Sequence, residues 1–317
     1  MKLKIFAIIL GLIVCGFGIY AICNVRAQNT VGADNYPPLP EPNEPQTIIC
    51  EHVLSAPPLP ASIDFCGEQV PLNLYWVREG IDRELINQYY QHSRTLLTLK
   101  RSARFFPVIE KILKEEKVPD DLKYLCIAES NLENVISPAK ASGFWQFMEG
   151  TGKNYGLEIN ENVDERYHLE KATEAACKFL KKLKKQFGSW ALAAAAYNMG
   201  EGGLLREMKE QEIDNYWELF LNQETSRYLS RCIAYKLLFE NQELYNIRVS
   251  TSDLYKPIDY KEIIVDKSIE DLRTYCTENK ILYRQLKELN PWLRSTKLPV
   301  KTDKTYILKC YSGSFSK

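Results

Sequence analysis

Apolar positions recur at helical spacing through the middle of the chain. In the segment LEKATEAACKFLKKLKKQFG (169–188), lysines occupy one face and the other face is apolar. That apolar face comprises Leu169, Ala172, Ala176, Phe179, Leu180, Leu183 and Phe187. Gly188 is a residue type that typically ends a helix. The segments RFFPVIEKILKEE and TSRYLSRCIAYKLLFE show the same periodicity, and strand alternation is absent from this part of the sequence. We therefore expect residues 70–247 to form a nearly all-α domain.

The pattern changes over residues 258–312. KEIIVDK and TYILKC are typical of strands, and SIEDLRTYCTENK and LYRQLKELNPWL, which lie between them, are typical of helices. Ser268, three residues before Asp271, indicates a cap at the start of the first of these helices. The sequence thus predicts a small β-α-α-β unit after the helical domain.

The chain begins with two lysines ahead of an uncharged apolar run from Ile5 to Cys23. Such a start is typical of a secretory signal or an uncleaved membrane anchor, neither of which belongs to the fold. The run is close to the ~20 residues that span a bilayer, and the small side chains of Val25 and Ala27 also suit cleavage. Residues 1–27 are therefore interpreted as signal peptide or membrane anchor, with both alternatives open.

Residues 28–69 are rich in proline and small side chains, as in PPLPEPNEP and APPLP. Such a composition favours an extended tether over a core element. We expect an exported protein of the periplasm or cell envelope, either released or attached to the membrane through its N-terminal segment.

Composition limits the classes of function. The 317 residues, of which 45% are hydrophobic, suffice for about two domains with a buried core. Lys plus Arg and Asp plus Glu number 41 each, whereas a nucleic-acid binder normally carries a basic excess. The three histidines are scattered and no CxxC motif occurs, so a metal site is not expected.

The nine cysteines suit an oxidising compartment. Two pairs could form disulfides, Cys50 with Cys66 and Cys276 with Cys310. The remaining cysteines beyond the leader fall in helical patterns, where a buried thiol is expected; they are Cys126, Cys177 and Cys232.

One carboxylate, Glu129, lies at the end of an apolar run. Pro119 can open a helix there, and that helix would carry Leu122, Leu125 and Cys126 inward, on the same stripe as Glu129. Burial disfavours the charged form and raises the pKa of a carboxyl group, so this group could hold a proton near neutral pH and give it to a leaving group. The alternative is a structural glutamate that caps a helix or pairs with an arginine.

Aromatic and amide side chains follow this helix. In SPAKASGFWQF (137–147), Gly143 allows a close backbone approach, and Trp145 and Gln146 place an aromatic face beside an amide. In AAAAYNMGEGG, Tyr197 and Asn198 lie on a helix of small residues. Sugars have apolar faces and dense hydroxyls, which such groups recognise. The alternative for Trp145 and Tyr197 is ordinary core packing. GEGG is not a phosphate loop, because it follows a helix and no Lys-Ser/Thr succeeds it.

Six segments resemble, in order and spacing, the motifs of lytic transglycosylases. They are ES (129–130), SPAKASGFWQF (137–147), GTGKNYGL (150–157), VDER (163–166), AAAAYNMGEG (193–202) and ETSRYL (224–229). The resemblance is to the soluble lytic transglycosylase (SLT) domain, in its membrane-bound D-like branch within the lysozyme-like superfamily. The C-terminal unit resembles a LysM module, although Asp-Lys-Ser replaces the usual Gly-Asp-Ser/Thr. The implied fold is mainly α, a lysozyme-like catalytic domain followed by a β-α-α-β peptidoglycan-binding module.

The resemblance also implies roles for individual residues. Glu129 matches the sole catalytic acid, and Ser137 matches the serine that helps to hold the substrate and the catalytic group. Gln146 matches the sugar-contacting glutamine, and Tyr197 and Asn198 match the Ala-Tyr-Asn motif that lines the cleft. Lysine stands at position 140, where glycine is common, so we expect this loop to be less able to adopt a positive φ.

The implied reaction is cleavage of the β-1,4 bond between N-acetylmuramic acid and N-acetylglucosamine in peptidoglycan glycan strands, with formation of a 1,6-anhydro-MurNAc end. Protonated Glu129 would donate to the glycosidic oxygen and then accept the proton of the muramyl C6 hydroxyl. The reaction needs no cofactor and no metal.

Two alternatives remain open on sequence alone. A hydrolytic muramidase on the same fold needs a second acidic group about 6.5–9.5 Å away to activate water, for which the candidates are Asp164, Glu165, Glu201 and Glu224. A non-catalytic wall-binding protein would bind peptidoglycan without cleaving it.

Overall fold

The computed structural model describes residues 55–312. The predicted leader, most of the predicted tether and Cys50, with its suggested disulfide to Cys66, lie outside the described residues. Every helix within residues 55–312 is too short or too polar to span a bilayer.

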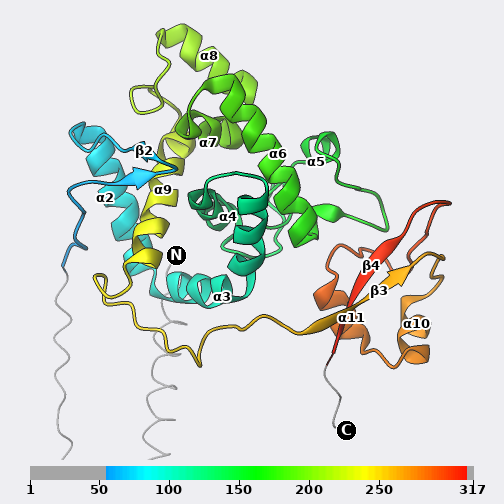
Figure 1. Ribbon diagram of the computed structural model, residues 1–317. Coiled ribbons are helices and arrows are strands. Elements are labelled where there is room, and N and C mark those ends of the chain that lie inside the picture. The colour runs from blue at the N-terminus through cyan, green and yellow to red at the C-terminus, as the bar shows by residue number, and fades with distance from the viewer. Residues whose placement is uncertain (1–54, 313–317) are drawn as a thin grey trace, which may run out of the picture. The chain divides into compact units, whose positions relative to one another are not determined.

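The first part of the described chain is a helical domain, preceded by the short hairpin of β1 (Asp64–Phe65) and β2 (Glu68–Gln69) (Figure 1). Its α-helices are α2 (Tyr75–Tyr90), α3 (His92–Glu115), α4 (Lys123–Ser130), α5 (Glu149–Asn154), α6 (Leu169–Phe187), α7 (Trp190–Met199), α8 (Glu201–Gln211) and α9 (Gln223–Glu240). Two 3-10 turns, η1 (Asp120–Leu122) and η2 (Glu165–Tyr167), precede α4 and α6. The predicted all-α character of this region is confirmed.

Helix α6 follows the sequence pattern closely. Its predicted apolar face is buried from Ala172 to Phe187, and Leu169 is half-buried. The helix ends at Gly188, which adopts a φ of 84°. A residue without a side chain adopts this left-handed conformation at no steric cost, so the glycine stops the helix where predicted.

The short helix α4 lies in the middle of the helical domain, in contact with α3 and α9 (Figure 1). Leu122, Leu125 and Cys126 are fully buried, as predicted. Helix α9 also packs against α2 and α7, so it joins α4 to these two helices.

The C-terminal part is the predicted β-α-α-β unit. Strand β3 (Tyr260–Val265) pairs antiparallel with β4 (Tyr306–Tyr311), and α10 (Leu272–Glu278) and α11 (Tyr283–Leu289) lie between them in sequence. The cap of α10 differs from the prediction: the Asp271 carboxylate itself accepts the backbone N–H groups of Arg273 and Thr274, at 2.8 and 2.9 Å. Ser268 is not the cap because Ile269 bridges Leu298, which holds this stretch extended.

Cys276 and Cys310 are free thiols, so the suggested disulfide between them is wrong. Both are buried in the core of the β-α-α-β unit, where a thiol packs as a small apolar side chain. The expectation for the helical region is confirmed: Cys126, Cys177 and Cys232 are free and buried.

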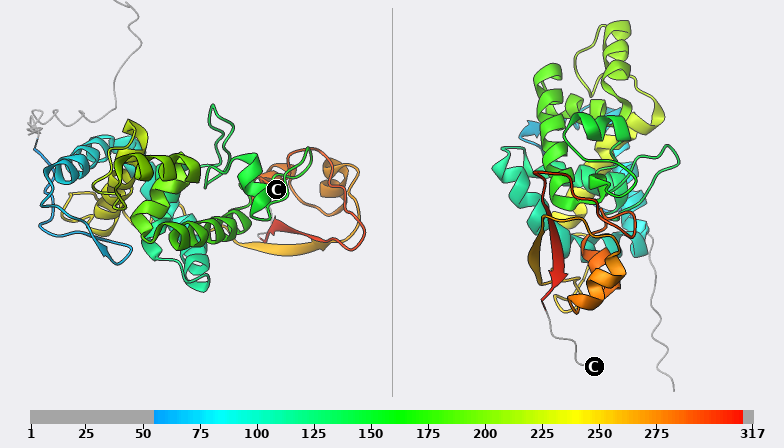
Figure 2. Two further views of the ribbon diagram at one scale, coloured as in Figure 1. Left: turned by 90° about the horizontal axis from the view of Figure 1, so that it is seen from above. Right: turned by 90° about the vertical axis from the view of Figure 1, so that its right-hand side faces the viewer.

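The segment between α5 and α6 lies against the β-α-α-β unit (Figure 2). Val163 and Tyr167, from this segment, are buried in the same apolar cluster as Leu272, Leu286 and Trp292 of the β-α-α-β unit. The helical domain therefore supplies part of that unit's core.

Candidate active site

Glu129 lies in the last turn of α4, which ends where Asn131 turns to a φ of 51°. The side chain is half-buried, and its Oε1 accepts a hydrogen bond from the Tyr228 hydroxyl at 2.6 Å. This is the short distance typical of a hydroxyl that donates to a charged oxygen. Tyr228 comes from α9, so the packing of α4 on α9 fixes the carboxyl group.

The surroundings hold the pKa of Glu129 well above its ordinary value. Its pKa is about 7 as the net result of four causes: burial, the largest, raises it, the Tyr228 hydrogen bond lowers it, the Glu224 charge raises it and the Arg231 charge lowers it. The group therefore carries a proton in a large fraction of molecules at neutral pH, as a general acid requires.

The other carboxylates that the sequence suggested are each paired. Asp164 binds Arg166 at 2.7 Å and Glu224 binds Arg231 at 3.1 Å. Glu165 pairs with Lys171, and Glu201 with Lys182. Of the four, Glu224 alone acts electrostatically on Glu129, so it is the one that the structure brings toward the acid.

Ser137 and Gln146 shape the loop that follows α4. The Ser137 hydroxyl accepts the backbone N–H of Ala141 at 3.0 Å. The Gln146 amide donates to the carbonyl oxygens of Val135 and Gly143, at 3.0 and 2.7 Å. Both side chains thus hold the backbone of the loop and remain half-buried.

The loop contains two non-glycine residues in left-handed conformation, Lys140 at φ 67° and Gln146 at φ 48°. The expectation that lysine would restrain this loop from a positive φ is therefore wrong. Such a conformation costs roughly 1–2 kcal/mol for a residue with a Cβ, so the contacts that hold the loop must offset it. Gly143, at φ 80°, fulfils the expected close approach: a Cβ there would lie 1.9 Å from the Arg166 carbonyl oxygen.

Trp145 does not offer a sugar-binding surface. Its side chain is 0% exposed, and its indole N–H donates to Thr173 on α6 at 2.9 Å. The prediction of an aromatic face beside the glutamine is wrong because the ring points into the core, and the alternative of core packing holds for this residue.

Tyr197 and Asn198 lie near the end of α7 and are half-buried. The Tyr197 hydroxyl donates to the Trp145 carbonyl oxygen at 2.7 Å, and the Glu129 charge contributes to the raised pKa of this tyrosine, after burial. Asn198 accepts a hydrogen bond from the Thr225 hydroxyl on α9 at 2.9 Å. The structure thus brings Tyr197 close to Glu129 and fastens α7 to α9.

Sequence reasoning missed Tyr228 and Arg231 as partners of the carboxyl group. The signal was present in the quoted motif ETSRYL, because Thr225, Tyr228, Leu229 and Cys232 form one buried stripe of α9. A tyrosine on such a stripe needs a partner for its hydroxyl, and the partner is Glu129. No cluster of metal-ligating side chains exists in the part of the chain that the structure describes.

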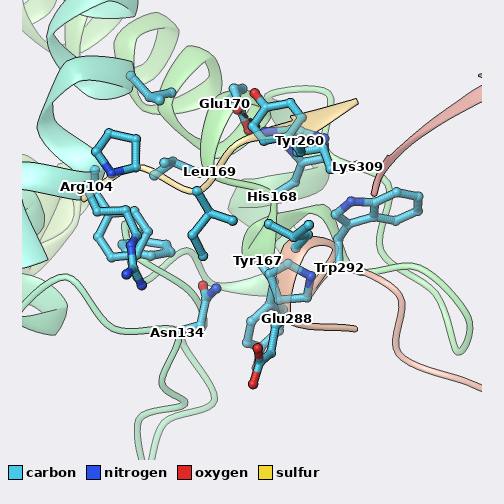
Figure 3. A pocket seen from close by; sticks show the side chains of 17 residues that line it. Arg104, Asn134, Tyr167, His168, Leu169, Glu170, Tyr260, Glu288, Trp292 and Lys309 are labelled. Carbon is cyan, nitrogen blue, oxygen red and sulfur yellow. Dashed lines mark hydrogen bonds and ion pairs between the residues drawn. The ribbon is translucent and has the colours of Figure 1, made fainter. Parts of the chain in front are cut away.

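A cavity of about 430 Å³ lies apart from these residues, between α3, the start of α6 and the β-α-α-β unit (Figure 3). None of the predicted site residues lines it. The Glu129 site and this cavity are therefore separate features.

Comparisons with known proteins give matches to both parts of the described chain. Residues 106–220 match the family model described as Transglycosylase SLT domain, and residues 261–310 match the one described as Soluble lytic transglycosylase C-terminal LysM-like domain. The chain is 34% identical over 183 residues to the membrane-bound lytic murein transglycosylase D of Escherichia coli K12, a match that covers 56% of this chain and 40% of that protein. The chain thus spans about two fifths of the length of this relative.

Two solved structures show weaker likeness. The 70 kDa soluble lytic transglycosylase of Escherichia coli aligns with a TM-score of 0.40 and 17% identity, over 56% of this chain and 33% of that one. The lytic transglycosylase Slt of Pseudomonas aeruginosa aligns with a TM-score of 0.35 and 20% identity, over 48% and 26% of the two chains. The sequence matches cover the helical region that holds Glu129 and the β-α-α-β unit in turn: the chain carries an SLT transglycosylase domain followed by a LysM-like domain of the soluble lytic transglycosylase C-terminal family.

Proposed function

We propose that this protein is a peptidoglycan lytic transglycosylase, with Glu129 as its catalytic acid and base. The observation that carries the proposal is the state of Glu129, a half-buried carboxyl group with a pKa of about 7 that a tyrosine hydroxyl holds in place. The murein transglycosylase named among its relatives supports the choice of substrate.

The reaction begins with protonated Glu129 beside the glycosidic oxygen between N-acetylmuramic acid and N-acetylglucosamine. As the C1–O bond breaks, Glu129 gives its proton to the departing oxygen, which leaves as a hydroxyl group. The ionised carboxylate then keeps the Tyr228 hydrogen bond and the attraction of Arg231, both of which favour its charged form.

The second step regenerates the acid. The muramyl C6 hydroxyl attacks C1 and loses its proton to Glu129, which closes the 1,6-anhydro ring. No water is consumed, so one carboxyl group suffices where hydrolytic glycosidases use two. Ser137, Gln146, Tyr197 and Asn198 are proposed to line the substrate groove, whereas Trp145 supports the groove from the core.

The prediction that the tether runs to residue 69 is wrong, because Ile63 and Phe65 are buried in the core of the helical domain and residues 64–69 form the β1–β2 hairpin. The proposed arrangement of the whole chain therefore has four parts. Residues 1–27 export or anchor the protein, residues 28–54 act as a tether, residues 55–247 form the catalytic domain with its preceding hairpin, and residues 258–312 form the LysM-like domain. The site of action is the cell envelope, and the proposed partners are peptidoglycan glycan strands.

A hydrolytic muramidase is the second candidate, and one observation favours it. Glu224 lies close enough to raise the pKa of Glu129, so it is a carboxylate that could activate water. Its ion pair with Arg231 on the same helix occupies it in the structure, which is why we rank the lyase first.

Mass spectrometry of the products of peptidoglycan digestion tests the proposal. A lytic transglycosylase releases muropeptides with anhydro ends, each lighter by one water than the reducing ends that a muramidase leaves. Glu129→Gln is expected to lower the rate by a factor of about 10²–10⁴, the usual contribution of a general acid. Glu210→Gln, at an exposed position on α8, is the matched control and should keep full activity.

Each contrary result has a distinct meaning. Reducing ends that disappear with Glu224→Gln would establish the muramidase. Wall binding without any release of muropeptides, unchanged by Glu129→Gln, would establish a non-catalytic wall-binding protein.

A further inference from the structure

The segment between α5 and α6 holds the LysM-like domain on one side and the loop at 137–147 on the other. Its contacts with the LysM-like domain are backbone hydrogen bonds and a shared apolar core. Asp164 N–H donates to the Trp292 carbonyl oxygen at 2.9 Å, and Arg294 N–H donates to the Asn162 carbonyl oxygen at 2.8 Å. Val163 forms a β-bridge with Leu293 and is buried in the core of the LysM-like domain.

The segment's side-chain contacts with the loop at 137–147 come from one arginine, Arg166. The Arg166 guanidinium binds the Asp164 carboxylate at 2.7 Å, with both side chains 10% exposed. The same group donates from Nη1 to the carbonyl oxygens of Lys140 and Phe147, at 3.1 and 3.2 Å. These carbonyls flank the stretch that includes Gly143, which packs against the Arg166 backbone.

The stretch between these two carbonyls is the strained part of the loop, where Lys140 and Gln146 adopt a positive φ. A guanidinium has five N–H donors in a fixed plane, so Arg166 can bind an acid and two carbonyls together. The Asp164 carboxylate orients the guanidinium, and the backbone of Asp164 is in turn bound to the LysM-like domain.

We propose that Arg166 is a positioning residue for the loop of Ser137 and Gln146, and that the LysM-like domain keeps Arg166 in place. The LysM-like domain therefore supports catalysis through Arg166, in addition to any binding of the cell wall. This inference rests on the proposed function for its effect on rate, whereas its effect on the loop does not depend on any activity.

The test uses the full chain with Arg166→Gln, Arg166→Lys and Val163→Ser. Lysine keeps a charge for Asp164 but lacks the planar fork, so Arg166→Lys should stay impaired like Arg166→Gln. We expect a rise in KM and a loss of kcat/KM of about 10-fold or more, while the alkaline limb of the pH profile, which reports Glu129, does not move. Val163→Ser should reproduce this result from the domain contact, and Glu278→Gln, exposed on α10, should have no effect.

Hydrogen exchange at the amides of residues 137–147 supplies the readout that is independent of activity. Faster exchange in the Arg166 variants and in Val163→Ser supports the proposal, even if the parent protein releases no anhydro product. Unchanged exchange in the loop of Val163→Ser would overturn it. So would a shift of the alkaline limb in the Arg166 variants as large as the shift that Glu224→Gln causes. A merely structural role predicts a lower melting temperature with KM and loop exchange unchanged.

The cavity in Figure 3 carries a second inference on separate observations. Its wall is largely apolar, with Phe105, Val108, Phe144, Leu169, Ile258 and Leu289 among the lining residues. Most of its charged groups are already paired: Lys309 with Glu170, Glu170 with His168 at 3.2 Å, and Glu288 with Arg284 at 2.8 Å.

Arg104 differs from these groups. Its Nε donates to the Lys256 carbonyl oxygen at 3.0 Å, and its guanidinium lies over the Tyr255 ring, 5.7 Å from the centroid. Within residues 55–312 no carboxylate forms an ion pair with it. The volume, about 430 Å³, lies in the usual range of small-ligand pockets. An apolar cavity with one unpaired guanidinium suits a small ligand that has a carboxylate and apolar groups.

A sugar ring suits this cavity less well. Trp292 is only 3% exposed, and it stacks with His168 at 5.9 Å and with Tyr306 at 5.6 Å between ring centroids. We infer that the cavity binds a short peptide through its free carboxylate, of the kind that peptide stems of peptidoglycan present. The identity of the stem rests on the proposed function, but binding of the peptide does not.

Calorimetry on the full chain with Glu129→Gln, which prevents turnover, tests this inference. The probes are an N-acetylated tripeptide that ends in a D-alanine carboxylate, its C-terminal amide and a chitin tetrasaccharide. We expect the acid to bind at least 10-fold more tightly than the amide, and Arg104→Gln to lose that difference while Arg78→Gln, exposed on α2, keeps it. Equal affinity for acid and amide, or displacement of the peptide by the tetrasaccharide, would overturn the assignment.

Discussion

The hydrogen bond from Tyr228 to Glu129 gives a quantitative prediction for Tyr228→Phe. The hydroxyl stabilises the carboxylate more than the neutral acid, because hydrogen bonds to charged groups are worth about 1.5–3 kcal/mol and neutral ones about 0.5–1.5 kcal/mol. The difference of roughly 1–1.5 kcal/mol corresponds to about one pKa unit. Loss of the hydroxyl should therefore raise the pKa of Glu129 from about 7 toward 8.

The assay is the pH dependence of kcat/KM for release of muropeptides between pH 5 and pH 9. Since the general acid must be protonated, activity falls as the pH rises through the pKa of Glu129, and the alkaline limb should move up by about one unit in Tyr228→Phe. Tyr235→Phe is the matched control, because this buried tyrosine of the same helix binds Gln88 and Asn131 instead. An alkaline limb that stays in place, or moves down, would refute the assignment of Glu129 as the acid that Tyr228 holds.

Further predictions concern charge, stability and backbone. Glu224→Gln removes a like charge and should shift the same alkaline limb to lower pH. Glu129→Gln should stabilise the fold by up to about 3 kcal/mol at pH 8 but not at pH 4 in urea titrations. Folding raises the pKa of Glu129 from 4.5 to about 7, so the ionised group at pH 8 destabilises the folded state, whereas the protonated group at pH 4 does not. Gly143→Ala, with its Cβ 1.9 Å from a carbonyl oxygen, should lower the melting temperature by several degrees. Asp271→Ala should cost about 1 kcal/mol of stability in chemical denaturation.

The periodicity of apolar residues was enough to predict the helices that are held in the fold by burial of one apolar face. The face of α6 and the stop at Gly188 follow from local rules, and so does the stripe of α4 that carries Glu129 inward. The burial of Glu129 could be predicted because Leu122 and Leu125 lie on the same face of the helix as Glu129, and a face with these apolar residues points into the core.

The remaining features depend on contacts between distant parts of the chain. Trp145 points into the core because Thr173 offers an acceptor there, and no local pattern distinguishes such a ring from an exposed one. Lys140 tolerates a positive φ because Arg166, 26 residues later, binds its carbonyl oxygen. The two free cysteines of the LysM-like domain likewise reflect how α10 and β4 pack, which their spacing in the sequence does not reveal.

Helix α9 presents Thr225 to Asn198 and Tyr228 to Glu129 less than one turn apart. Each residue of an α-helix advances the direction of the side chain by about 100°, so one residue inserted between these positions would swing the tyrosine away from the acid. Among relatives of this chain, insertions and deletions are therefore expected in the connection before α9, where an added residue does not change which side chains of α9 face Asn198 and Glu129. The start of α9 should vary only by substitution, and an engineered one-residue insertion after Thr225 should abolish turnover even if the helix itself forms.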